Sequence, residues 1–150
     1  MLIATLWTVL GCHTPGSMTH LLPDGYVGPV VIVFDDPNGK APEHDEEGAV
    51  VYEIPPDGVL RLCTPAPEAG LYDVNYFYVR PDRTRQEIPR HVEQATLQVF
   101  AEVDGTTGEQ EDGNPIRWSA YVVGVPNERD NWGKVRGEAT SHAIGIPGLL

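Results

Sequence analysis

The chain has 150 residues, of which 41% are apolar and 21% are charged, and this suffices for one domain with a buried core. A formal net charge of −12 argues against nucleic acid and anionic membrane surfaces as partners, because a polyanion repels both. The 16 glycines and 14 prolines predict many turns and few long helices, although their share stays below that of disordered chains.

Residues 1–12, MLIATLWTVLGC, carry no charged side chain and are too few to cross a bilayer as a helix, which takes about 20 residues. Their length and composition match the apolar part of an export signal. The segment ends in Val9-Leu10-Gly11-Cys12, which resembles a bacterial lipobox. That resemblance implies cleavage before Cys12 and a diacylglycerol on its thiol. It places the protein in the bacterial cell envelope, lipid-anchored and outside the cytoplasm, on the outer membrane where the host has one.

The segment after Cys12 begins with His13-Thr14-Pro15-Gly16-Ser17, a polar composition typical of a flexible tether. We therefore expect an export signal over residues 1–12, a linker over residues 13–21 and one domain over residues 22–146.

The two cysteines, Cys12 and Cys63, allow two arrangements. If Cys12 is acylated, Cys63 is a lone thiol, and its strand-like context VLRLC predicts that it is buried. If residues 1–12 are instead a buried apolar strand, a disulfide between Cys12 and Cys63 is the alternative.

The domain reads as short apolar runs separated by turns, beginning with turn, strand and turn over residues 23–39. Its strand is apolar on both faces, so we expect it to be covered on both sides. Pro-Asp-Gly opens this strand and recurs before a later one. Further strands are predicted at residues 49–54, 59–63, 71–79, 84–88 and 117–125.

Two segments are less clear. Residues 90–103 fit a helix or a strand, and we favour a strand from Thr96, with Val99 on its apolar face and Glu102 on its polar face. The last residues predict one more strand or a loose tail. Within residues 71–79, Tyr76 and Tyr78 share a face, where they either stack on a ligand or belong to the core.

These patterns predict an all-β fold, a single β-sandwich that is prealbumin-like or immunoglobulin-like, with long acidic loops. The two acidic loops span residues 40–48 and 104–115. Their carboxylates leave calcium binding open, but the spacing fits no metal-binding loop, so we predict no metal site and no cofactor.

The motifs PDGYVGPVVIVF, YEIPPDGVL, FYV and EIP resemble a family of uncharacterised bacterial lipoproteins, a domain of unknown function. The later YVVGVPNE is similar to the closing strand of that family. The resemblance implies a fold and brings no catalytic residues with it.

No catalytic or nucleotide-binding motif occurs in the sequence, so we predict a binding or structural module rather than an enzyme. Its expected partners are the membrane, through the lipid anchor, and an envelope protein or glycan, but not nucleic acid. The predicted recognition loop combines a large aromatic side chain with charges: Asn127, Glu128, Arg129, Asp130 and Trp132. In the competing interpretation Trp132 belongs to the core.

The alternative function is a small envelope hydrolase without a recognisable motif. Its first candidate residues are Asp35, Asp36, His44 and His91.

Overall fold

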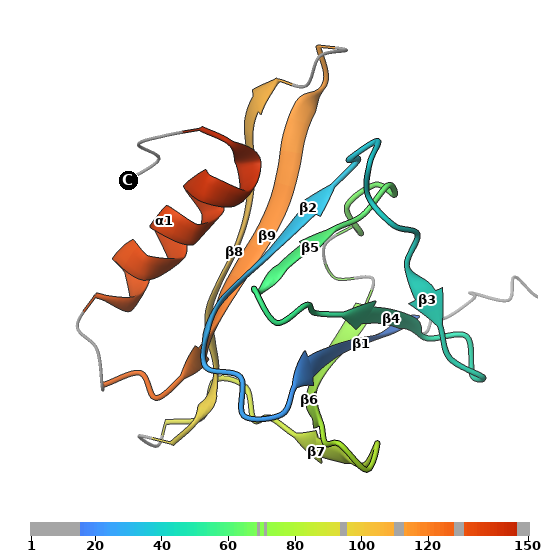
Figure 1. Cartoon of the computed structure of the whole chain (residues 1–150), viewed down its shortest axis with the longest axis vertical. Helices are drawn as coiled ribbons and strands as arrows, with labels where there is room; N and C mark the ends of the chain where they lie inside the picture. The colour runs from blue at the N-terminus through green and yellow to red at the C-terminus, as the bar shows by residue number, and fades with distance from the viewer. Residues whose placement is uncertain are drawn as a thin grey trace, which may run out of the picture.

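Two β-sheets pack face to face in the computed structural model, which describes residues 16–68, 70, 72–93, 96–109, 113–127 and 131–146 (Figure 1). The first sheet has the order β3 (Glu43–His44), β4 (Val50–Glu53), β1 (Gly16–Pro23), β6 (Tyr72–Val79) and β7 (Arg85–Glu87). The second has the order β5 (Val59–Arg61), β2 (Gly28–Phe34), β9 (Pro115–Gly124) and β8 (Gln98–Glu109). The predicted all-β sandwich is confirmed.

Strand β1 is the centre of the first sheet. It pairs in parallel with β4 on one side and with β6 on the other. The linker predicted for residues 13–21 is therefore wrong over residues 16–21, whereas residues 13–15 lie outside the described residues. The side chains from Met18 to Leu22 are buried, but the polar residues at the start of this strand give it the composition of a linker.

Strand β2 is apolar on both faces because each face meets a different layer. Val30, Ile32 and Phe34 point into the core between the sheets. Val31 and Val33 lie on the outer face, in a cluster with residues of α1 (Trp132–Ile144). Figure 1 shows this helix lying across the outer face of the second sheet. The predicted cover on both sides of this strand is confirmed.

A long hairpin replaces the acidic loop predicted at residues 104–115. Strand β8 continues to Glu109 and pairs with β9 in antiparallel register. Polar and glycine residues suit a strand here because this hairpin extends beyond the body of the sandwich (Figure 1). The strand favoured from Thr96 begins at Gln98, close to its predicted start.

The C-terminal segment forms α1 rather than the predicted strand or tail. Four of its thirteen residues are buried, so the sequence shows only a weak apolar stripe. Gly133 and Gly137 also lower its helix propensity. The helix forms through packing on the sheet, and Gly145 closes it in the left-handed conformation with φ of 73°.

Cys63 is exposed, so the prediction of a buried thiol is wrong. Strand β5 ends at Arg61, and Leu62 is the last side chain of this run to enter the core. Cys63 then faces outward.

The second Pro-Asp-Gly turn brings the backbone close to strand β2. Gly58 has φ of +76°, and a Cβ atom placed on it would lie 2.6 Å from the Pro29 carbonyl oxygen. It would lie 2.1 Å from the hydroxyl oxygen of Tyr26, which donates a hydrogen bond to that carbonyl. Gly48 has φ of +84° but has no neighbouring atom within 4 Å of such a Cβ.

These two glycines allow backbone strain to be separated from steric contact. We expect Gly48→Ala to lower the free energy of unfolding by about 1–2 kcal/mol, the cost of the left-handed conformation. Gly58→Ala should cost at least about 1 kcal/mol more, because it also displaces the Tyr26 hydrogen bond. Urea unfolding of both variants measures the difference, and equal losses would contradict the close approach described above.

Candidate functional site

A cavity of about 600 Å³ lies between the two sheets. One side of it comes from β1, β4 and β6, and the other side comes from β2, β8 and β9. The connection between β5 and β6 also contributes to its lining. Sites for small organic molecules have volumes of about 300–1,000 Å³, so this cavity is of ligand size.

Three ring-bearing side chains form a row across the first sheet. Because β1 pairs in parallel with both neighbours, Tyr52, His20 and Tyr76 stand in register on β4, β1 and β6. The His20 ring centroid lies 5.2 Å from that of Tyr52 and 4.8 Å from that of Tyr76. All three side chains are buried and line the cavity.

Tyr121 completes this group from the opposite sheet. Its hydroxyl oxygen lies 3.0 Å from His20 Nδ1, and its ring meets that of Tyr76 edge-on at 5.1 Å. Burial lowers the pKa of His20 to about 3, so the imidazole is neutral at physiological pH. Burial likewise raises the pKa of Tyr52 to about 12 and that of Tyr121 well above its ordinary value. The phenols therefore remain protonated.

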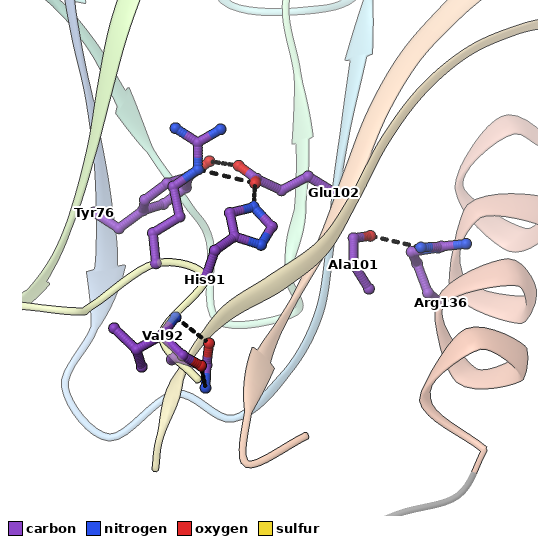
Figure 2. Close-up of polar contacts among 8 residues, drawn as sticks. Tyr76, His91, Val92, Ala101, Glu102 and Arg136 are labelled. Carbon is purple, nitrogen blue, oxygen red and sulfur yellow. Dashed lines mark hydrogen bonds and ion pairs between the residues drawn. The ribbon is translucent and has the colours of Figure 1, made fainter. Parts of the chain in front are cut away.

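A β-bulge in β8 directs a carboxylate toward the same cavity. Phe100 pairs with Val122 and Val103 with Ala120, so Ala101 and Glu102 together oppose the single residue Tyr121. Ala101 has φ of 54°, a conformation that costs a non-glycine residue about 1–2 kcal/mol. Its carbonyl oxygen accepts a hydrogen bond of 2.5 Å from Nη1 of Arg136 on α1. Figure 2 shows Ala101 and Glu102 on opposite sides of the strand.

Glu102 accepts hydrogen bonds from three side chains (Figure 2). The Tyr76 hydroxyl donates to Oε1 at 2.5 Å, Arg90 Nε donates to Oε2 at 2.9 Å, and His91 Nε2 contacts Oε2. Burial acts to raise the pKa of Glu102, but these hydrogen bonds and the charge of Arg90 outweigh it, so its pKa is lowered. The carboxylate is a fixed anion at the side of the cavity.

The predicted recognition loop is not brought together as an exposed anchor. Trp132 is 5% exposed, it donates from Nε1 to the Val125 carbonyl oxygen, and its ring meets Phe100 edge-on. Its interpretation as core is therefore correct. Asn127 is exposed, whereas residues 128–130 lie outside the described residues. Cys12 lies outside them as well.

The four candidate residues of the hydrolase alternative are dispersed. Asp35 and Asp36 follow β2, where Asp36 accepts a hydrogen bond from the Asn38 amide and pairs with Arg61 at 2.9 Å. His44 is exposed on β3, and His91 contacts Glu102. The described residues hold no group of three or more His, Cys, Asp or Glu side chains suited to a metal ion. The same part of the chain has no helix long and apolar enough to cross a membrane.

Sequence reasoning missed His20, Tyr121 and Glu102. His20 falls within the predicted linker of residues 13–21, and Tyr121 is one apolar residue among several in its predicted strand. Alternation along β8 placed Glu102 on the polar face, and the bulge reverses that assignment. The shared face of Tyr76 and Tyr78 was the one usable signal, since both are buried there.

Fold and cavity together define a β-sandwich domain with a ligand-sized interior space. The chain belongs to a family of unknown function, DUF6843, whose model matches residues 15–129. Its fold is similar to that of a crystal structure described as a "Putative Lipoprotein from Bacillus anthracis", with a TM-score of 0.55 and 15% sequence identity. This likeness covers 87% of the present chain and 80% of the other. No curated protein matches the sequence.

The buried imidazole makes stability depend on pH in a defined window. The unfolded chain takes up a proton near pH 6.5, whereas the folded chain resists protonation of His20 down to about pH 3. Stability therefore falls as pH decreases through this range, by up to about 1.4 kcal/mol per pH unit. We expect His20→Phe to flatten this slope between about pH 5 and 6.5 in urea unfolding.

Glu102→Gln is the matched control for that measurement. Folding lowers the pKa of Glu102 from its ordinary value of 4.5, so its carboxylate stabilises the folded state fully at pH values above 4.5. This contribution is lost only as the pH falls below that value. This variant should keep the slope between about pH 5 and 6.5 and change the profile below it. An unchanged slope in His20→Phe would show that the imidazole is not buried as described.

Proposed function

We propose that this chain is a binding module of the bacterial cell envelope, held at the membrane by a lipid on Cys12, which takes a small molecule into the cavity between its sheets. The cavity of about 600 Å³ carries this proposal, because it joins aromatic side chains with a few oriented polar groups. The lipobox-like sequence ending at Cys12 supports the anchor. The description of the structural neighbour as a lipoprotein supports it independently.

Binding is favoured over catalysis by the state of Glu102. A general base works best with a pKa near the working pH, whereas the pKa of Glu102 is lowered. Its oxygens are already engaged by Tyr76, Arg90 and His91. Such a carboxylate suits the fixing of neighbouring donors more than the removal of a proton from a substrate.

The anchor is tested by labelling. We expect radioactive palmitate to enter the full-length protein when it is expressed in a bacterial host that processes lipoproteins. Cys12→Ser should abolish the label and release the protein from the membrane fraction. Cys63→Ser is the control and should leave the label unchanged, because Cys63 lies two residues after the end of β5 in the folded domain and outside the lipobox-like sequence. Label that survives Cys12→Ser would refute the anchor.

The cavity is tested by filling it. Ser119 lies on β9 and lines the cavity, so Ser119→Phe places a ring inside the space. Ser17 lies exposed on β1, outside the cavity lining, and Ser17→Phe makes the same chemical change there. Each full-length protein is purified in detergent, incubated with a small-molecule extract of the host and analysed for retained compounds by mass spectrometry.

We expect the native chain and Ser17→Phe to retain the same compounds and Ser119→Phe to lose them by at least about tenfold, a change of 1.4 kcal/mol in binding free energy. Circular dichroism confirms that both variants are folded. If all three proteins retain the same compounds, or if none retains any, the cavity is not a binding site.

A further inference from the structure

The depth of the cavity is uncharged and mostly aromatic, and this constrains what it accepts. The side chains at its base are between 1% and 5% exposed: His20, Ile32, Phe34, Tyr52, Tyr76 and Tyr121. His20 is neutral, and the phenols are protonated. An ionic group placed there would lose its hydration without gaining an unpaired counter-charge, since Glu102 is already held by Arg90 and His91.

The other charged side chains of the cavity lining lie toward solvent. Glu68 and Asp104 carry negative charge at the exposed part of the lining, and Arg90 and Arg117 carry positive charge. Together with Glu102, which Arg90 pairs with, the lining holds three carboxylates and two guanidinium groups, so that it carries one net negative charge with His20 neutral. This negative charge, like that of the whole chain, disfavours an anion, and a cation would still lose its hydration at the uncharged base of the cavity.

The tautomer of His20 follows from its contact with Tyr121. The hydroxyl of Tyr121 is buried, and His20 Nδ1 is its hydrogen-bond partner among the described residues. A buried hydroxyl hydrogen without an acceptor is costly, so the phenol donates to Nδ1 and the neutral imidazole carries its proton on Nε2. Nε2 has no hydrogen-bond partner in the described part of the chain, and His20 lines the cavity. The imidazole thus offers one N–H donor to a ligand.

These features match a flat apolar ring with one acceptor atom. Tyr52, Tyr76 and Tyr121 surround His20 in edge-on and tilted arrangements, which suits contact with another aromatic ring. A sugar suits the interior poorly, because most of its hydroxyl groups would lose water without finding a partner there. A ligand with a single carbonyl oxygen leaves no such group unsatisfied.

We propose that the cavity binds an uncharged aromatic ring compound that bears a carbonyl-type oxygen, and that the Nε2–H group of His20 donates a hydrogen bond to that oxygen. This inference rests on the proposed function, in which the cavity is the binding site, and it names the chemical class of the ligand. His20 is then the residue that determines specificity, and the tyrosines position the ring.

The test uses a pair of ligands that differ in one atom group. The compounds 2-acetylnaphthalene and 2-isopropenylnaphthalene have nearly the same shape, but only the first has a carbonyl oxygen. We expect the full-length protein to bind the acetyl compound about five- to tenfold more tightly in equilibrium dialysis, the effect of one hydrogen bond. Three further probes represent an anion, a cation and a sugar: 2-naphthoate, 2-naphthylmethylamine and N-acetylglucosamine. Each should bind more weakly than the acetyl compound.

Substitution of His20 assigns the preference to its ring nitrogen. His20→Phe keeps a ring in place and should bind both naphthalenes equally. Because this change strands the hydroxyl of Tyr121, the double variant His20→Phe with Tyr121→Phe removes both polar partners and should show the same equal binding. Long-range proton–nitrogen spectra of the native protein should show His20 as the Nε2–H tautomer, with a shift of that nitrogen only on addition of the acetyl compound.

A preference for the acetyl compound that survives in both His20 variants would overturn the inference, and so would tightest binding of a charged probe or of the sugar. If a charged probe or the sugar binds most tightly and Ser119→Phe abolishes that binding, the cavity remains the binding site and only the ligand class is rejected. If Ser119→Phe leaves the binding of every probe unchanged, the cavity is not the binding site and the proposed function is rejected as well.

Discussion

The parallel pairing of β1 with both β4 and β6 is the constraint on which the site depends. In parallel register, residues at equal height point to the same face, so Tyr52, His20 and Tyr76 enter the core side by side. A shift of one residue in either pairing would turn a tyrosine away from the imidazole. The uncharged state of His20 follows from this enclosure, because the surrounding rings leave little water to solvate an imidazolium ion.

The second sheet supplies the polar partners through an irregularity. A regular β8 would have placed Glu102 on the outer face, and the extra residue opposite Tyr121 turns it inward. The unfavourable conformation of Ala101 is offset by Arg136, which binds the carbonyl oxygen that the bulge exposes. Helix α1 thereby contributes to a cavity that it does not line.

Much of the sandwich was predictable because its strands are bounded by turn residues with clear conformational preferences. Pro-Asp-Gly before β2 and β5, and the two apolar faces of β2, identify strands and their cover from the sequence. Helix α1 was not predictable, because its stability comes from contact with the sheet and its own glycines oppose it. The candidate site likewise depends on tertiary contacts that the local sequence does not reveal. His20 and Tyr121 are 101 residues apart, and the direction of Glu102 depends on one extra residue in a strand.

The early start of β1 limits how far the sandwich can lie from Cys12. The strand begins at Gly16, so only three residues separate it from Cys12. An extended chain spans at most about 3.6 Å per residue, so at most about 14 Å separates Cys12 from the sandwich. A lipid on Cys12 would therefore hold the domain against the headgroups. The molecules within its reach would be those dissolved in, or released from, the adjoining leaflet.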